Sequence, residues 1–359
     1  MFKVLGSERK CQEMAAVKTV FITEKRKTMP QSHDDVSLVN DVSTAVETIK
    51  KELHKRIVGQ DEVIDDLLAC FLCGGHCLLI GVPGLAKTML VSSLAQCLHL
   101  QFNRIQFTPD LMPADITGSE ILFEERASGS REFRFIKGPV FSNIVLADEI
   151  NRTPPKTQSA LLQSMQEREV TSSGCTYPLP SPFWVLATQN PIEQEGTYPL
   201  PEAQLDRFMF SIEINYPDLQ SEIDIVKRTT VPQKENLSAV LSAEQLSAYR
   251  DLVWRVPVAD SVVSYAVSLA RATRPGDALC PDAVKKLLTW GAGPRASQFL
   301  ILASKAYAVI EGRPTPDKTD VKRAVYPVLR HRLVKSFHAE AEGVSTNDIV
   351  KMIVDSAKE

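Results

Sequence analysis

Apolar residues in the first two thirds of the chain form short uninterrupted runs, separated by segments with helical periodicity. Apolar positions recur every three to four residues over 41–56 and 60–71, which predicts two amphipathic helices. Five apolar runs without a polar face follow, at residues 76–80, 102–107, 144–147, 183–188 and 208–214. Such runs are typical of strands in a parallel sheet that helices cover on both faces. We therefore predict an α/β domain with a parallel sheet at its core.

The pattern changes after residue 216, and this change predicts a second domain. Strand-like runs stop there, and helical periods dominate over residues 223–229, 262–272, 294–310 and 320–329. At the other end, residues 1–40 mix Lys, Glu, Ser and Gln with little periodicity, so we expect a largely disordered extension. The predicted organisation is an extension over 1–40, an α/β domain over 41–216 and a helical domain over 217–359.

Composition and charge narrow the functional classes. The 359-residue chain has 44% hydrophobic and 24% charged residues, close to globular averages, and a net charge of −3. That charge gives no overall field to attract nucleic acid or an anionic membrane. No apolar run approaches the length of a membrane-spanning helix, and the N-terminus lacks the apolar stretch of a secretory signal. We expect a soluble, cytoplasmic protein that does not insert into membranes.

Three cysteines have a spacing that could belong to a metal site. Cys70, Cys73 and Cys77 are surrounded by Leu and Phe, and no second pair of ligands follows them. A structural zinc site usually takes four ligands from two such pairs. We expect these cysteines to be buried as small hydrophobic residues.

Residues 81–88, directly after the first predicted strand, match a phosphate-binding loop with one exception. They read GVPGLAKT, so Ala86 stands where the pattern has its second glycine. Backbone N–H groups at a helix N-terminus can cradle phosphate, Lys87 can reach the β and γ oxygens, and the Thr88 hydroxyl can ligate Mg²⁺. We expect Ala86 to begin the helix without a positive φ. The predicted nucleotide-binding residues of this segment are Gly81, Val82, Pro83, Gly84, Leu85, Ala86, Lys87, Thr88 and Met89.

Two further strand ends carry polar residues suited to nucleotide hydrolysis. Asp148 and Glu149 follow the apolar run 144–147, so Asp148 could hold Mg²⁺ and Glu149 could polarise the attacking water. Asn190 follows a later run, and its amide offers a donor and an acceptor to a water or the γ-phosphate. Each signal has an ordinary alternative, namely a solvated acidic pair and an asparagine that forms a turn. Their combination with the loop favours a site for ATP and Mg²⁺.

Seven stretches, taken in order, resemble the MoxR family of AAA+ ATPases over roughly residues 40–335. They are IVGQ (57–60), GVPGLAKT (81–88), TPDLMPADITGSE (108–120), ADEINRTPPKTQSALLQSMQE (147–167), ATQNPIEQE (187–195), QLDRF (204–208) and GAGPRA (291–296). The resemblance implies an AAA+ αβα sandwich with a five-stranded parallel sheet, followed by a small all-α lid. It also implies ATPase activity, and Ala86 in the phosphate loop is usual in this family.

The resemblance assigns roles that spacing alone does not. Val58 and Gly59 would lie against the adenine, and Asn190 would be the first sensor of the γ-phosphate. Arg295 would be the second sensor, reaching from the lid to the same phosphate. Arg207 would act as an arginine finger on the nucleotide of a neighbouring subunit, where it neutralises charge that develops on the phosphoryl group.

Two insertions and the expected partners also follow from the resemblance. Residues 115–137 would form the helix-2 insertion of this clade and residues 169–183 a hairpin, and both face the central channel in related rings. The first carries five acidic and four basic residues and the second no Lys or Arg, which is a poor lining for a phosphate backbone. We expect a ring of six subunits that remodels a protein client. A protein with a von Willebrand factor A domain is one candidate client.

Several alternatives accompany these assignments. Arg207 could be a surface arginine paired with Asp206 or Glu202, and Arg295 a solvated charge. A scaffold that binds ATP without turning it over is a further alternative, against which the intact Lys87, Asp148 and Glu149 argue. A nucleic-acid-remodelling motor would use the late basic cluster, whose ordinary interpretation is a solvated helix face. That cluster consists of Lys322, Arg323, Arg330, Arg332 and Lys335.

Overall fold

The computed structural model describes residues 32–124, 131–192, 196–231 and 236–357. Its centre is a five-stranded sheet in the order β2-β5-β8-β1-β9, in which all neighbouring strands are parallel. The strands are β1 (Cys77–Ile80), β2 (Phe102–Gln106), β5 (Ile144–Asp148), β8 (Trp184–Gln189) and β9 (Phe210–Glu213). Each of them falls within or overlaps one of the five apolar runs, so the predicted parallel core is confirmed.

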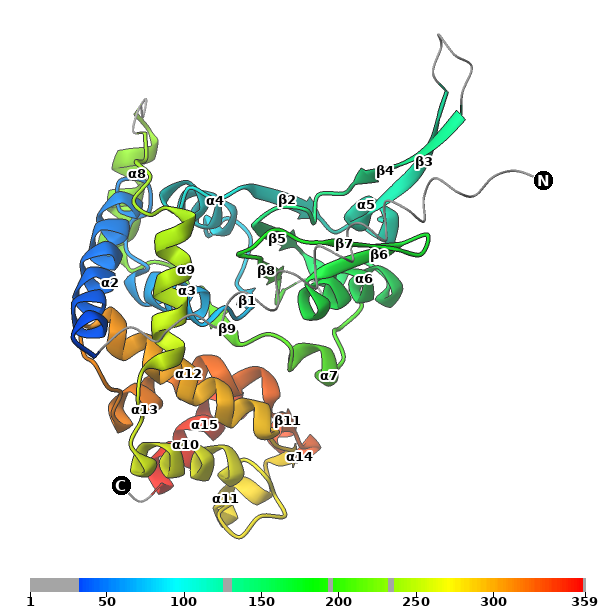
Figure 1. Ribbon diagram of the computed structural model, residues 1–359. Coiled ribbons are helices and arrows are strands. Elements are labelled where there is room, and N and C mark those ends of the chain that lie inside the picture. Colours follow the sequence, from blue (N-terminus) through cyan, green and yellow to red (C-terminus); the bar gives the residue numbers. More distant parts are fainter. Residues whose placement is uncertain (1–31, 125–130, 193–195, 232–235, 358–359) are drawn as a thin grey trace.

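Helices cover both faces of this sheet, which explains why its three central strands β5, β8 and β1 are apolar on both sides (Figure 1). Leu78 points into one apolar cluster with α5 (Pro113–Thr117) and α6 (Pro155–Glu167). Leu79, the next residue, points into a second cluster on the other face. That face is covered by α2 (Ser32–Leu53), α3 (Asp61–Cys73), α4 (Lys87–Cys97) and α9 (Ala243–Arg255). Helix α2 begins at Ser32 rather than at the predicted residue 41.

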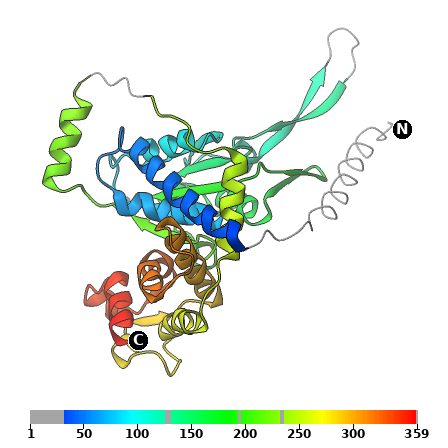
Figure 2. The same ribbon diagram turned by 60° about the vertical axis from the view of Figure 1, so that its left-hand side comes forward.

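The lid lies below the sheet in Figure 1 and is mostly helical. Its helices are α10 (Asp260–Ala272), α11 (Asp282–Lys285), α12 (Pro294–Ile310), α13 (Lys318–Leu329), α14 (Phe337–Ala341) and α15 (Thr346–Ser356). The expectation of a wholly α-helical lid is wrong in one detail. A short antiparallel ribbon joins β10 (Leu288–Trp290) to β11 (Val334–Lys335), just after the 3₁₀ turn η2 (Arg330–Arg332). Helix α8 (Leu219–Thr229) stands apart from the lid and buries none of its residues (Figure 2).

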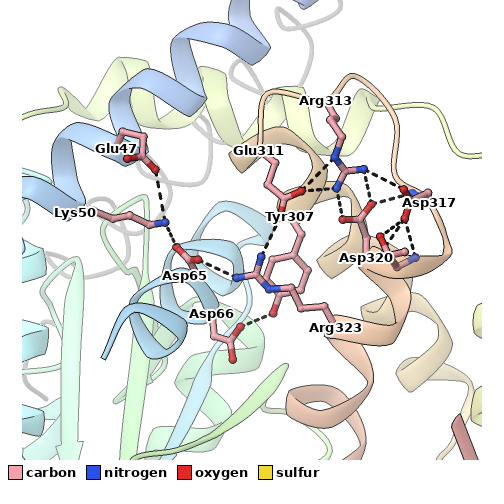
Figure 3. A network of polar contacts seen from close by, with 11 residues as sticks. Glu47, Lys50, Asp65, Asp66, Tyr307, Glu311, Arg313, Asp317, Asp320 and Arg323 are labelled. Atoms are coloured by element: carbon pink, nitrogen blue, oxygen red, sulfur yellow. Dashed lines mark hydrogen bonds and ion pairs between the residues drawn. The ribbon is translucent and has the colours of Figure 1, made fainter. Parts of the chain in front are cut away.

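Polar contacts tie the lid to the helices beside the sheet (Figure 3). The buried Tyr307 hydroxyl of α12 donates to Asp66 Oδ1 of α3 over 2.6 Å. Arg323 of α13 lies 4.2 Å from the centre of the Tyr307 ring and pairs with Asp65 of α3 over 2.9 Å. Burial raises the pKa of Asp66 to about 6, against the opposing effects of the Tyr307 hydrogen bond and Arg323. The junction is therefore a charged network in which burial disfavours the ionised form of the Asp66 carboxyl group.

This network corrects the expectation of a solvated basic face. Arg323 pairs with Asp65 and Glu311, and Arg330 pairs with Glu213 over 3.1 Å. Arg332 is buried. Its Nε donates to Asp206 Oδ1, on the loop before β9, over 2.8 Å. These three arginines hold the lid to the rest of the chain, because their charges face carboxylates and not open solvent.

Two β-hairpins project from the sheet domain, where the insertions were predicted (Figure 1). The first joins β3 (Gly118–Glu124) to β4 (Arg131–Lys137), and the second joins β6 (Glu169–Ser172) to β7 (Cys175–Pro178). Phe135 of β4 stacks on Tyr177 of β7 with ring centres 4.3 Å apart. The two hairpins are thus in contact at their bases.

The three closely spaced cysteines are buried thiols, as predicted. Cys70, Cys73 and Cys77 are free, and burial raises the pKa of the first two well above the usual range. Within the described ranges there is no cluster of three or more His, Cys, Asp or Glu side chains suited to a metal ion. In the same ranges no single helix is long and apolar enough to cross a membrane. Helices α9 and α10 together have the length and composition of a span, but they are bent by 90° with respect to each other.

Candidate nucleotide-binding site

The phosphate loop connects the end of β1 to the start of α4, as predicted. Gly84 has a φ of +86° and Ala86 a φ of 55° with ψ of 21°, both in the left-handed region. The expectation that Ala86 needs no positive φ is therefore wrong. Ala86 is the N-cap of α4, and a left-handed residue there costs about 1 kcal/mol for an L-amino acid. The turn imposes this conformation because the chain must reverse between the strand and the helix.

A cavity of about 430 Å³ lies over this loop and the ends of β5 and β8. Its lining residues are Pro83, Gly84, Leu85, Ala86, Lys87, Thr88, Met89, Arg104, Asp148, Glu149, Thr188 and Asn190. The structure thus brings together the loop, the acidic pair and the amide that the sequence placed at three separate strand ends. Gly81 and Val82 are not among the lining residues, but their carbonyl oxygens accept hydrogen bonds from the Lys87 ammonium, with Val82 O at 3.0 Å.

The electrostatics of the cavity are set by Lys87 and two carboxylates. Partial burial lowers the pKa of Lys87, while Asp148 and Glu149 act in the opposite direction. Asp148 is buried, and its Oδ1 accepts from the Thr188 hydroxyl over 2.6 Å. The same hydroxyl accepts from the backbone N–H of Glu149 over 2.8 Å, so Thr188 fixes both acidic residues.

Besides Thr188, three residues that contact the acidic pair were missed from the sequence. Arg104 donates to Asp148, Gln106 donates to Glu149 Oε2 over 3.0 Å, and Arg152 pairs with the same oxygen over 3.1 Å. A signal for the first two was present. Residues 102–107 read FNRIQF, and the polar positions 104 and 106 are two residues apart, so both side chains lie on one face of β2.

Asn190 presents a donor that the protein itself leaves unused. Its Oδ1 accepts from the backbone N–H of Ile192 over 3.1 Å, which fixes the orientation of the amide. Its buried Nδ2 has no acceptor among the residues that the structure describes. A buried amide donor without a partner is costly, and one that lines a cavity suits an oxygen of a ligand.

The donor set of the cavity fits Mg²⁺ bound together with a nucleotide. The Thr88 hydroxyl and the Asp148 carboxylate both line it. Magnesium in nucleotide sites is usually held by one or two such oxygens together with phosphates and waters, not by a full cage of protein ligands.

Comparisons with known proteins agree with this site. Residues 76–210 match the ATPase family associated with various cellular activities, and residues 282–353 match an AAA lid domain. Chaperone MoxR1 of Mycobacterium tuberculosis is 44% identical over 85% of this chain and 80% of its own length. The chain belongs to the MoxR family of AAA+ ATPases.

Two further relatives support the assignment. Protein MoxR of Methylorubrum extorquens is 31% identical over 83% of this chain and 90% of its own length. The crystal structure of a protein assigned as an ATPase from Cytophaga hutchinsonii superposes with a TM-score of 0.82 at 42% identity. That similarity covers 90% of this chain and 97% of the solved one. The predicted MoxR resemblance and AAA+ fold are therefore confirmed.

The two arginines with predicted roles at a γ-phosphate, Arg207 on that of a neighbouring subunit and Arg295 as second sensor, have partners outside the cavity in this MoxR-family chain. Arg207 donates from Nη1 to the Leu162 carbonyl of α6 over 2.9 Å. Arg295, at the start of α12, pairs through Nη1 with Asp206 Oδ2 over 2.9 Å. Neither of them is among the residues that line the cavity, and their roles at the γ-phosphate stay predictions. In this arrangement of the lid, Asp206 holds Arg295.

Val58 and Gly59 lie in the turn between α2 and α3 and do not line the cavity. Gly59 has a φ of +64°, and its nearest neighbour across the chain is Ser221 on α8. Their role at the adenine stays a prediction.

Proposed function

We propose that this MoxR-family chain hydrolyses ATP in the presence of Mg²⁺ at the cavity over the phosphate loop. The observation that carries the proposal is the convergence of the loop, the acidic pair and the unpaired Asn190 amide on one cavity. Thr88 and Asp148 would hold the ion, which neutralises phosphate charge when bound. Lys87 would contact phosphate oxygens in place of its present carbonyl partners.

Glu149 is the group proposed to polarise the attacking water. It lines the cavity, and Gln106 and Arg152 both contact its Oε2, so its carboxylate has a defined orientation. Asn190 can donate from Nδ2 to the water or to a phosphate oxygen, since Ile192 already occupies its Oδ1. Together the residues of the cavity would bind the nucleotide, orient the attacking water and take a proton from it, which is how phosphoryl-transfer sites accelerate hydrolysis.

A second copy of the chain is proposed to complete the site. Charge that develops on the transferred phosphoryl group calls for cations beyond Lys87 and Arg104, and Arg207 and Arg295 both lie outside the cavity of their own chain. A head-to-tail contact would bring this arginine pair to the cavity of the next subunit. Such heterologous contacts close into rings when the rotation allows it. We propose a ring with six subunits as the expected number.

A protein client is proposed for the two hairpins. The first hairpin exposes large apolar side chains, namely Ile121, Leu122, Phe123, Phe133 and Ile136. Exposed apolar groups on a projecting element are typical of protein-binding sites. The word chaperone in the name of the M. tuberculosis relative agrees with this use. Nothing favours a nucleic-acid partner, because the arginines of the basic cluster are paired with carboxylates.

Two substitutions test the proposed activity. Lys87→Ala should weaken binding of a fluorescent ATP analogue by at least about tenfold, because the only ammonium of the cavity is removed. Glu149→Gln should keep the affinity and lower turnover by about 100-fold or more, because the amide cannot take a proton from water. Exposed Lys156 on α6 provides the control, and Lys156→Ala should change neither quantity. Equal binding by wild type and Lys87→Ala, or full turnover by Glu149→Gln, would contradict the proposal.

A further inference from the structure

Arg104 is hydrogen-bonded to Asp148, the carboxylate that the proposed function assigns to the metal ion. It lies on β2, and its guanidinium crosses to the neighbouring strand β5, where Nη2 and Nε donate to Asp148 Oδ2 over 2.6 and 2.9 Å. The other oxygen, Oδ1, accepts from the Thr188 hydroxyl over 2.6 Å. Both oxygens of Asp148 therefore have partners within the chain.

This arrangement places two cations in competition for one carboxylate. Arg104 lines the same cavity as Thr88 and Asp148. A metal ion bound to Asp148 Oδ2 would lie next to a guanidinium that donates to the same atom, and like charges at such a distance repel strongly. One of the two cations must withdraw before the other can bind.

The charge of the cavity indicates where the guanidinium goes. Its four charged side chains, Lys87, Arg104, Asp148 and Glu149, sum to zero. A nucleotide with its Mg²⁺ adds net negative charge, so the cavity then has phosphate oxygens for a further cation. Arg104 suits this move because its side chain is 47% exposed, and a guanidinium binds phosphate oxygens in pairs. Its other hydrogen-bond partner is Gln106, an uncharged amide.

From these contacts we infer that Arg104 exchanges partners, pairing with Asp148 before nucleotide binds and with the phosphates once the metal–nucleotide complex enters. The inference rests on the proposed nucleotide site and deepens it. Arg104 is then a positioning residue that couples metal and nucleotide binding. It disfavours metal binding to the cavity alone and adds a cation when metal and phosphate arrive together.

Mn²⁺ alone is the probe for the first half of the inference, because it prefers oxygen ligands like Mg²⁺ and its free concentration can be followed by electron paramagnetic resonance. Arg104→Gln should bind Mn²⁺ at least about tenfold more tightly than wild type, since the competing charge is gone. Arg104→Lys should fall between the two because a lysine keeps the charge without the fork of donors. Adding Asp148→Asn to Arg104→Gln should return the affinity to that of wild type or below.

The second half is tested with a fluorescent ATP analogue in Mg²⁺. Arg104→Gln should bind it about tenfold more weakly than wild type. The control is Arg271→Gln, which removes the ion pair between Arg271 on α10 and Asp277 and should bind the analogue normally. Equal Mn²⁺ affinity in folded wild type and Arg104→Gln would overturn the inference, as would tight Mn²⁺ binding that survives Asp148→Asn. A wild type that binds no analogue would instead contradict the proposed function itself.

Discussion

The polar side chains of the phosphate cavity come from the ends of neighbouring parallel strands, whereas those around Asp206 come from a loop of the sheet domain and two elements of the lid. The cavity needs only β1, β2, β5 and β8 to pair in register. The second group, which we call the arginine cluster, consists of Arg295 and Arg332, which both pair with Asp206, and of Arg207, which follows Asp206 in the chain and donates to the Leu162 carbonyl. The two pairs with Asp206 exist only while the lid is docked.

This difference separates binding from hydrolysis. Parallel pairing places strand ends at one edge of a sheet whatever the lid does, so the ability to hold nucleotide is built into the sheet domain. The arginine cluster depends on the lid, since Arg295 begins α12 and Arg332 belongs to η2. We therefore expect changes in the cluster to affect turnover and lid docking while they leave nucleotide affinity almost unchanged.

Arg207→Ala should give the largest effect of the variants in the cluster. Turnover should fall by about 10³-fold, the lower end of what arginine fingers contribute elsewhere, because no cation replaces it at the neighbouring phosphate. Affinity for a fluorescent ATP analogue should stay within about twofold of wild type. Mixing Arg207→Ala with Glu149→Gln should restore part of the activity, since shared rings contain sites with an intact Glu149 and an intact Arg207. Steady-state ATPase assays of the two variants and their mixtures measure this.

Arg255→Ala is the matched control for that experiment, because Arg255 pairs with Asp35 on the surface of α2 and α9. It should hydrolyse ATP like wild type. Full turnover by Arg207→Ala, or mixed rings without any recovered activity, would contradict a role across the subunit boundary.

Arg332→Met should have the next largest effect, and on stability. Arg332 is buried against Asp206 and the carbonyls of Phe208 and Met209, and burial lowers its pKa to about 10. Its loss removes a buried cation from Asp206 and a donor from both carbonyls, and it should lower the free energy of unfolding by about 3 kcal/mol. Arg295 is the exposed second partner of Asp206, so Arg295→Ala should lower the free energy of unfolding by under about 1 kcal/mol. Urea titrations give both values, and equal stability of the two variants would disprove the contrast.

Asp66→Asn should give the smallest effect, visible only as a change in pH dependence. The folded pKa of Asp66, about 6, lies above its ordinary value of 3.8, so the folded chain favours the protonated form. Wild type should therefore gain about 1 kcal/mol of stability relative to Asp66→Asn when the pH falls from 7.5 to 5. The asparagine can still accept from Tyr307. Urea unfolding at both pH values checks this, and parallel changes in the two proteins would contradict the raised pKa.

The sequence predicted the cavity better than the arginine cluster for a physical reason. Strand ends are local signals, so the apolar runs before Lys87, Asp148 and Asn190 were enough to bring these residues together. The pair between Arg295 and Asp206 was not predicted because it depends on how the lid docks, which no local pattern encodes. The same holds for the pairs of Arg323 with Asp65 and of Arg330 with Glu213, whose members lie more than 100 positions apart in the chain.

Smaller errors have equally specific causes. The left-handed φ of Ala86 follows from the reversal of the chain between β1 and α4, which overrides the ordinary preference of alanine. Arg104 and Gln106 were overlooked because polar residues within an apolar run were taken as part of the strand alone. Their alternation was the signal that they share a face with the acidic pair.

ATP hydrolysis measured against protein concentration, at fixed Mg²⁺ and ATP and with sedimentation at each concentration, tests the central claim most directly. The account predicts that activity per subunit rises as larger species form, because the arginine cluster of one subunit completes the cavity of the next. Constant activity per subunit from a monomer would contradict it, since the cavity would then hydrolyse ATP without any arginine from a neighbour.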